Sequence, residues 1–286
     1  MTTSGTTSSH QFRTLAPKDQ LRIRPAIALS ALRAAAGFWL MIAAIGQLIF
    51  VMYIVSFYGS STVRGDFAAW NKVLPHGYIA GDSIGNAALA GHMLFAAIIM
   101  FGGLLQLIPQ IRTHAPRFHR WNGRVYMATA VAATVTGIYM VWFRGSAGHA
   151  AQQVAITING LLILACAFMT VRLAMARKLA AHRRWALRLF LVVSGVWFFR
   201  VGLMFWIAVN GGPVGFDPAT FRGPFLVFLG FAQYLLPLAV LELYLRASDN
   251  GSAASRIAMA AVLVILALAI GVGIGVATMG MWWPHI

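Results

Sequence analysis

Four histidines stand at the ends of four consecutive apolar stretches, where they could hold a metal-containing group. They are His92, His119, His149 and His182. Because successive membrane helices run in opposite directions, we expect His92 and His149 toward one face of a membrane, and His119 and His182 toward the other. Neutral imidazole is a good axial ligand for haem iron, and a helix bundle can supply facing side chains from two helices. The spacing therefore predicts two histidine pairs, each suited to one b-type haem.

Arginines near these histidines could neutralise the propionate groups of haem. Arg124 and Arg188 accompany the inner pair, and Arg200 accompanies the outer pair. Guanidinium groups bind carboxylates through two parallel hydrogen bonds. Arg200 also lies deep within an apolar stretch, where a charge is costly and needs a partner. We expect it to face the bundle interior and to border a polar pocket together with His92.

Each of these residues also has a structural interpretation. His119 and His182 open the basic aromatic sequences HRW and HRRW, which are typical of helix ends anchored at lipid headgroups. His149 adjoins a glycine at a helix boundary and is explained by that position. Only His92 lies about two turns inside its span, where an anchoring role explains it less well.

Three other polar residues within the apolar stretches are expected to serve packing. Glu242 stands four residues before Arg246, a spacing that predicts an ion pair within one helix. Gln106 and Asn159 are expected to form hydrogen bonds between helices.

The elements that must position these residues are seven apolar stretches, each long enough to cross a bilayer. They cover residues 32–57, 84–108, 122–144, 149–171, 186–210, 224–246 and 257–281. The sequence therefore predicts an all-α, polytopic membrane helix bundle of about seven spans. Spans two to five are expected to form a four-helix core around the histidines.

The basic residues predict the orientation of this bundle, because positive charge gathers in cytoplasmic linkers. Arginines and lysines crowd the N-terminal segment and every second linker, whereas the alternate linkers hold only Arg64, Lys72, Arg144 and Arg222. The N-terminus is thus predicted inside and the C-terminus outside. Residues 1–26 are expected to be a disordered or interfacial cytoplasmic tail, followed by a transmembrane domain over residues 27–286.

Composition excludes several classes of protein. Of the 286 residues, 60% are hydrophobic and only 10% are charged, against about 25% charged in soluble domains. The net charge of +16 lies in short linkers and indicates contact with the lipid bilayer, with no nucleic acid as partner. The single cysteine, Cys166, allows no disulfide and no covalent attachment of haem. No lysine lies within a predicted span, which excludes a retinal Schiff base.

Polar and glycine-containing elements spread over four of the predicted spans resemble a known family. They are Gly91-His92, Gln106, Arg112, Pro116, His119-Arg120, Gly123-Arg124-Val125-Tyr126, Gly137, His182-Arg183-Arg184-Trp185, Arg188 and Arg200. Together they resemble the bacterial membrane proteins catalogued as domain of unknown function 2306, over about residues 85–205. This resemblance implies a membrane protein, with the bacterial inner membrane as the expected location, and it implies no particular activity.

The placement of histidines on four successive helices also resembles the ascorbate-reducible di-haem cytochromes b. These proteins carry electrons across membranes between two haems. The two resemblances differ at His149, which the di-haem pattern requires as a ligand and the other family does not fix.

Two kinds of function follow as hypotheses. The first is a transmembrane b-type cytochrome that holds haem b between the histidine pairs and exchanges electrons with quinone or another small donor or acceptor. Its enzyme class would be a transmembrane oxidoreductase. The alternative is a haem-free transporter, channel, lipid-binding module or structural subunit, with a polar intramembrane pocket around His92 and Arg200.

Overall fold

A computed structural model of the chain describes residues 17–74, 76–145 and 149–286, and nearly all of them are helical. The long helices are α1 (Pro17–Ile54), α3 (Ser83–Leu107), α5 (Pro116–Phe143), α6 (Ala150–Met175), α7 (Leu179–Val193), α8 (Gly195–Asn210), α9 (Pro224–Asn250) and α10 (Ala253–Ala277). The short helices are η1 (Val55–Gly59), α2 (Ser60–Val63), η2 (Phe67–Lys72), α4 (Pro109–His114), η3 (Thr278–Trp282) and η4 (Trp283–His285).

The number of membrane crossings agrees with the sequence. Within the described ranges, six helices are long and apolar enough to span a membrane, and the bent pair α7 and α8 makes a seventh crossing if it counts as one span. The predicted all-α membrane bundle is therefore confirmed, while the side on which each terminus lies stays a prediction. The expected tail lies outside the described residues as far as residue 16. From Pro17 onward the chain is helical, so the helix begins eight residues before the candidate span, which starts at Pro25.

Several helices begin where the local sequence favours a start. Asp82 precedes α3 and accepts a hydrogen bond from the backbone of its first turn at 2.9 Å, and Ser252 does the same for α10 at 3.2 Å. Pro116 and Pro224 open α5 and α9, where the missing N–H costs nothing. These signals fix the helix ends that the apolar stretches only approximate.

The fifth predicted span, residues 186–210, differs from the prediction because it is broken. Helices α7 and α8 meet at an angle of 54° on either side of Ser194. The Ser194 hydroxyl donates to the Phe190 carbonyl at 2.8 Å, a contact that bends helices, and a Ser–Gly pair is a common site of sharp kinks. Gly195 is also required by packing, because a Cβ there would lie 2.8 Å from the amide nitrogen of Asn159.

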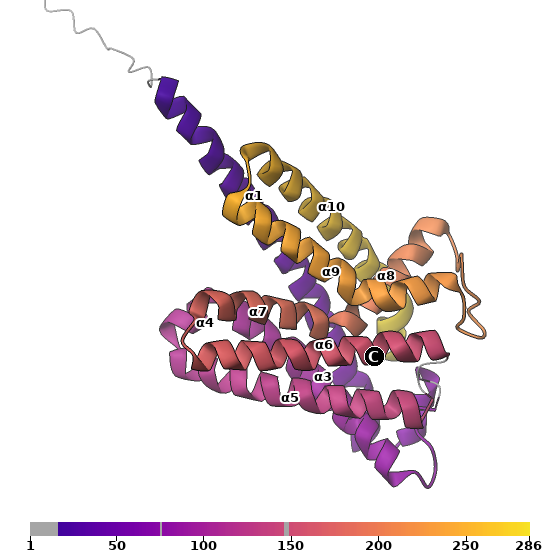
Figure 1. Cartoon of the computed structure of the whole chain (residues 1–286). Helices are drawn as coiled ribbons and strands as arrows, with labels where there is room; N and C mark the ends of the chain where they lie inside the picture. Colours follow the sequence, from indigo (N-terminus) through magenta and orange to yellow (C-terminus); the bar gives the residue numbers. More distant parts are fainter. Residues whose placement is uncertain (1–16, 75, 146–148) are drawn as a thin grey trace, which may run out of the picture.

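The predicted four-helix core is present in part, because only the first half of the fifth span, in α7, joins spans two to four. Figure 1 shows α3, α5 and α6 running side by side with α7 against them. One buried cluster joins Ile99 of α3, Tyr126 of α5, Cys166 of α6 and Leu189 of α7. Tyr234 of α9 completes this cluster, so a fifth helix also borders the core.

The second half of the broken span belongs to another group of helices. Helix α8 packs on α10 and α9, while α1 lies along α10 and also contacts α3 (Figure 1). Phe50 of α1, Trp197 of α8 and Ile274 of α10 share a buried cluster with Leu89 of α3. Because of the break at Ser194, the fifth span packs with both groups of helices. Its first half, α7, joins the core, and its second half, α8, packs on α9 and α10.

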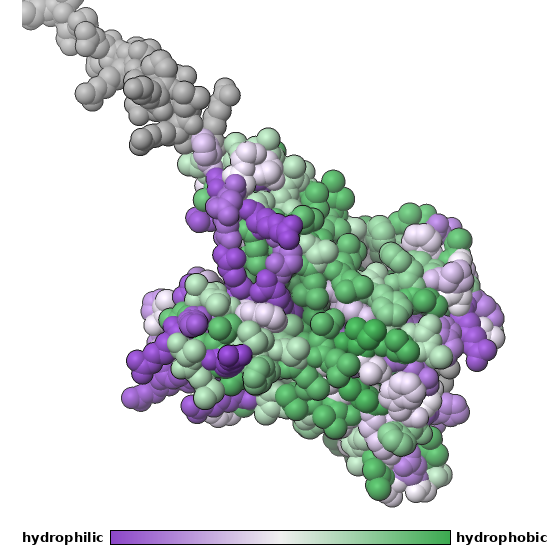
Figure 2. Space-filling view, in the orientation of Figure 1, coloured by the Kyte–Doolittle hydropathy of each residue, from purple (hydrophilic) through white to green (hydrophobic). Residues whose placement is uncertain are grey.

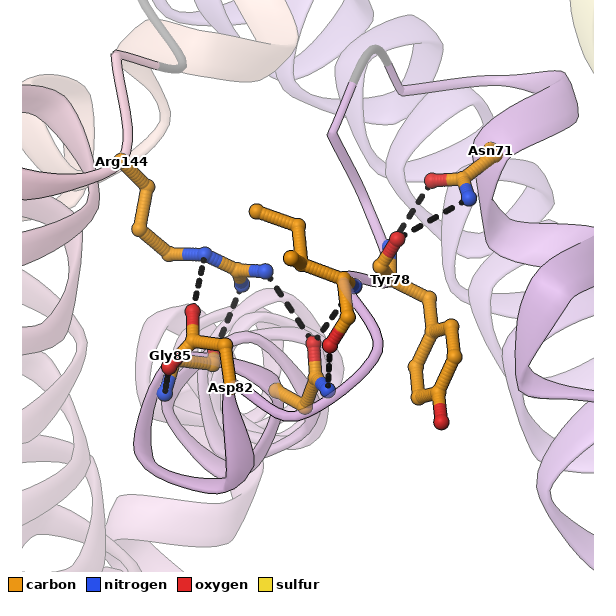
Figure 3. A network of polar contacts seen from close by, with 7 residues as sticks. Asn71, Tyr78, Asp82, Gly85 and Arg144 are labelled. Atoms are coloured by element: carbon orange, nitrogen blue, oxygen red, sulfur yellow. Dashed lines mark hydrogen bonds and ion pairs between the residues drawn. The ribbon is translucent and has the colours of Figure 1, made fainter.

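A polar network fastens the segment before α3 to the end of α5 (Figure 3). The Arg144 side chain is only 4% exposed and forms an ion pair with Asp82 at 3.2 Å. It also donates to the Gly85 carbonyl at 2.7 Å and to Asn86 Oδ1 at 3.1 Å. Asn86 holds the backbone of Ile79 with two further hydrogen bonds. Arg144 thus serves packing at this end of the bundle.

The surface follows the pattern of a membrane protein. Figure 2 shows hydrophobic residues over the middle of the visible face and hydrophilic residues gathered toward the helix ends. Such an apolar belt between polar ends fits a bilayer, whose hydrocarbon core is about 30 Å thick.

Candidate functional site

An apolar groove of about 580 Å³ lies between α1, α7, α8, α9 and α10, with the end of α3 at its edge. Its walls include Trp39 of α1, Phe190 of α7, Val201 of α8, Leu229 of α9 and Ile270 of α10. Ligand sites in proteins have volumes of about 300 to 1,000 Å³, so the groove is large enough to hold a small molecule or a lipid chain.

The groove runs along much of the length of α9. Its α9 wall extends from Phe225 to Tyr244, which corresponds to about 28 Å of helix rise. The apolar core of a bilayer is about as thick. The α9 wall of the groove is therefore about as long as the apolar core of a bilayer is thick.

The end of the groove nearest the linker between α8 and α9 is closed by aromatic packing. Trp206 stacks on Phe225 with ring centroids 4.4 Å apart and donates its indole N–H to the Val214 carbonyl at 2.8 Å. In the same linker, the Thr220 hydroxyl and a backbone N–H donate to Asp217, and these bonds hold the pKa of that carboxyl below its usual value.

The opposite end of the groove, predicted to face the cytoplasm, is bridged by two ion pairs from α7 to α9. Arg188 donates from Nε and Nη2 to Glu242 Oε1 at 2.7 Å each. Arg184 contacts Asp249 at 2.7 Å. The predicted ion pair of Glu242 with Arg246 is therefore wrong. Helix α7 lies against α9 at this level, and Glu242 pairs with Arg188 of α7 instead.

Buried polar groups from three other helices lie beside the break between α7 and α8. Gln47 of α1 donates to Ser194 Oγ at 3.0 Å. The Asn159 amide of α6 and the Gln233 amide oxygen of α9 both lie beside Gly195. Each is within 4 Å of the point where a Cβ of residue 195 would stand. Gln233 also lines the groove. A polar centre thus adjoins the apolar groove through Gln233.

The histidines predicted for an outer haem are not brought to one level. The His92 ring packs at 3.2 Å from the Cβ position of Gly137 on α5, and Gly160 of α6 lies against the neighbouring Ile138. His149 precedes Gly160 by about 16 Å of helix rise. Axial ligands of one haem lie on opposite sides of the same iron, at bond lengths near 2 Å. This offset leaves His92 and His149 without the facing arrangement that a shared haem requires.

Each of these two histidines has a bonding role of its own. His92 Nδ1 lies 3.0 Å from the Ala133 carbonyl and 3.2 Å from the Thr136 hydroxyl, so the ring fastens α3 to α5. His149 accepts the Gln152 backbone N–H at 3.4 Å and caps α6. A proton on Nδ1 leaves the Nε2 lone pair of His92 free, whereas the cap puts the proton of neutral His149 on Nε2.

His119 and His182, the predicted inner pair, lie near each other. His182 Nδ1 donates to the Thr170 carbonyl at 2.9 Å, which leaves its Nε2 lone pair free. The His119 carbonyl accepts the Gln106 side chain at 2.9 Å, as predicted for Gln106. His119 lies near enough to His182 for their charges to interact. Among the described residues, no group of three or more His, Cys, Asp or Glu side chains could hold a metal ion.

The three candidate arginines differ in environment. Arg188 is paired with Glu242, and Arg124 is exposed on α5. Arg200 donates to the Val196 carbonyl at 3.3 Å and lies 5.4 Å from the centre of the Phe50 ring. No carboxylate of the described chain is within 4 Å of Arg200.

Arg200 is separate from the groove. The groove residues of α8 include Phe198, Val201 and Gly202, and the helical period places Arg200 on the opposite face. Its charge is near enough to act on His92. A pocket around Arg200 and His92 stays a prediction, while the cavity described above lies across α8 from it.

Sequence reasoning missed Gln47, Ser194 and Gln233. A Ser–Gly pair inside an apolar stretch and single amides within spans were visible signals of a break and of a polar centre. The groove itself had no such signal, because its walls come from six separate helices.

Comparisons with known proteins support the membrane assignment and add no activity. No curated protein and no solved structure matches the chain, so the resemblance to di-haem cytochromes has no support from them. A family model described as a predicted membrane protein of DUF2306 matches residues 89–236. The match continues beyond the elements quoted above into α9 and includes Asn159, Ser194 and Gln233. Because it covers more than half of the chain, this protein belongs to the DUF2306 family of predicted membrane proteins.

Proposed function

We propose that the protein is a haem-free lipid-binding module that holds the chain of one long-chain lipid in the groove along α9. The observation that carries this proposal is the groove itself, about 580 Å³ of nearly apolar space with an α9 wall about 28 Å long. Apolar walls at membrane depth offer no polar anchor along most of their length. A hydrocarbon chain is the ligand that such walls accommodate.

The dimensions favour a lipid chain over another protein element. A transmembrane helix is about 10 Å wide with its side chains and about 30 Å long. A space of 580 Å³ is several times too small for it. Bilayer lipid is present at the groove in any membrane, so no further partner has to be assumed.

The ends of the groove support binding of a single chain. Trp206 and Phe225 close one end, and the pairs Arg188–Glu242 and Arg184–Asp249 hold α7 against α9 at the other. A groove limited at both ends suits the length of a single chain.

The test is photolabelling of the full-length protein in phosphatidylcholine nanodiscs with a diazirine derivative of hexadecanol. We expect saturable labelling of α8 and α9 peptides that unlabelled hexadecanol displaces. Ala232→Trp, which fills the groove, should reduce it at least fivefold. Leu235→Trp is the matched control, because Leu235 lies on the same helix, is 52% exposed and is not part of the groove wall. Non-saturable labelling, or equal labelling of both variants, would contradict the proposal.

A second candidate function is a b-type cytochrome at the inner histidines, with quinone or another small molecule as redox partner. The free Nε2 of His182 and the nearness of His119 favour it. Bound haem would supply one-electron transfer, with His119 and His182 as its ligands. An absorption spectrum of the purified protein, with and without dithionite, tests this. A reduced b-type spectrum that His182→Ala abolishes would support it, and a colourless protein would exclude it. For either function, the expected location is the bacterial inner membrane.

A further inference from the structure

The groove has one end that lies toward the side predicted to be cytoplasmic, and we call this end the inner mouth. Its wall residues there are Ala36 and Gly37 of α1, Leu187 of α7 and Tyr244 of α9. Helices α1 and α7 begin on this side and α9 ends on it. Because the groove is about as long as the apolar core of a bilayer is thick, the next helical turn beyond the inner mouth reaches the level of the lipid headgroups.

Arg33 of α1 stands one helical turn beyond the inner mouth. It precedes Ala36 by three residues and Gly37 by four, and residues at these spacings share one face of a helix. The Arg33 side chain is exposed. Within the described ranges, no carboxylate lies within 4 Å of it. Arg33 is therefore free to bind an anion at this end of the groove.

Arg183 of α7 occupies the corresponding position on another wall. It precedes Leu187 by four residues and Phe190 by seven, so it continues the groove face of α7 toward the helix start. Arg183 is also exposed, and none of the ion pairs of the described chain includes it. Two helices thus each place one unpaired guanidinium beyond the same end of the groove.

The charges around the inner mouth do not cancel. Its two nearby carboxylates, Glu242 and Asp249 of α9, are already paired with Arg188 and Arg184. Arg246 of α9 adds a further exposed positive charge. Such an excess of positive charge favours an anionic headgroup over a neutral one, and basic sites between membrane helices on the cytoplasmic side are typical binding sites for acidic lipid headgroups.

Phosphate is the anion that suits this arrangement. Guanidinium groups form strong, charge-assisted hydrogen bonds with phosphate oxygens. A phosphate also has enough oxygen acceptors to be contacted from more than one helix. It is present at headgroup level in a bilayer, directly beyond the apolar chain that the groove accommodates.

We infer that the lipid held in the groove is an anionic phospholipid whose phosphate lies at the inner mouth, between Arg33 and Arg183. One of its hydrocarbon chains lies along α9. This inference rests on the proposed function, because it names the chemical class of the ligand in the same groove.

The test compares two photolabels in the nanodisc assay, diazirine derivatives of hexadecyl phosphate and of hexadecanol, with the diazirine on the same carbon near the headgroup. We expect the phosphate to label the native protein at about tenfold lower concentration than the alcohol, close to the effect of one charge-assisted hydrogen bond. This preference should decrease at high salt. Fragmentation of the labelled α9 peptide should place the label near Tyr244 and not near Phe225.

Arg33→Gln and Arg183→Gln should each reduce the preference about threefold, which is half of the total on a logarithmic scale. The double variant should remove the preference and still allow labelling by the alcohol. Arg117→Gln is the matched control. Arg117 is exposed at the same predicted side of the membrane, but its helix, α5, contributes no residue to the groove wall. This variant should keep the full preference.

Equal saturable labelling by both photolabels in the native protein, or a preference retained by the double variant, would overturn the phosphate inference and leave the lipid groove standing. Displacement of the phosphate photolabel by inorganic phosphate would also overturn it, because the ligand would then be a free anion. Absence of saturable labelling by either photolabel would overturn both the inference and the proposed function.

Discussion

Gln47 and Ser194 are joined by a hydrogen bond of 3.0 Å, although 147 residues separate them. The bond runs from the Gln47 amide of α1 to the Ser194 hydroxyl, which itself donates to the Phe190 carbonyl at 2.8 Å. The first span is thereby tied to the sharp bend between α7 and α8. The polar centre beside the groove is built on this contact.

A double-mutant cycle measures that contact. Gln47→Leu and Ser194→Ala each remove one partner, and the double variant should be more stable than the sum of the single effects predicts. We expect a coupling energy of about 0.6 kcal/mol, which is typical of hydrogen bonds between membrane helices. The measurement is unfolding of the purified protein in detergent. Strict additivity of the two effects would mean that the bond contributes nothing.

The ion pairs between α7 and α9 should respond to charge exchange. Arg188→Glu and Glu242→Arg each place like charges together and should lower the thermal midpoint, whereas the double variant should recover most of the loss. Because Glu242 is 41% exposed, we expect no more than about 1 kcal/mol from the pair, and less at high salt.

The neighbouring pair of Arg184 with Asp249 is the control for that exchange, since both of its side chains are more than a third exposed. The same swap there should give a smaller effect. A double Arg188/Glu242 variant no more stable than its single variants would show that the pair does not hold the helices together.

Arg144 should be the arginine whose replacement lowers the stability of the protein most. Arg144→Ala removes a buried guanidinium and leaves Asp82 and Asn86 without their partner, so we expect a loss of about 3 kcal/mol. Asp82→Asn should cost less, because asparagine can still cap α3. Thermal unfolding in detergent distinguishes the two, and an equal or larger effect of Asp82→Asn would contradict this ranking.

The topology prediction follows from seven crossings and from the distribution of basic residues. A phosphatase reporter fused after Ile286 should be active, because it is exported, and a cytoplasmic reporter at the same site should be inactive. The control is the same pair of reporters placed after Asn250, in the linker between α9 and α10, where the activities should be reversed. Active cytoplasmic reporters at both sites would refute the count of seven.

The sequence predicts the spans well because apolar length is a strong local signal. All seven stretches correspond to helices or to the bent pair, and the expected core of spans two to five forms except for the α8 half of the fifth span. The partner of Glu242 was predicted wrongly, because spacing within one helix says nothing about an arginine brought in by another.

The candidate site was less accessible to sequence reasoning. Histidines attract attention by their chemistry, yet His92 and His149 serve helix packing and capping in this structure. Gln233 has ordinary neighbours in the sequence, and its importance depends on Gly195 and Asn159 arriving from other helices. Such a site is defined by tertiary contacts alone.

Native mass spectrometry of the purified protein, released from mild detergent, tests the central proposal most directly. We predict that the native chain and Leu235→Trp each retain one lipid-sized adduct, and that Ala232→Trp loses it. A native chain without any retained lipid, or an adduct unchanged by Ala232→Trp, would contradict the account of a lipid-binding groove along α9.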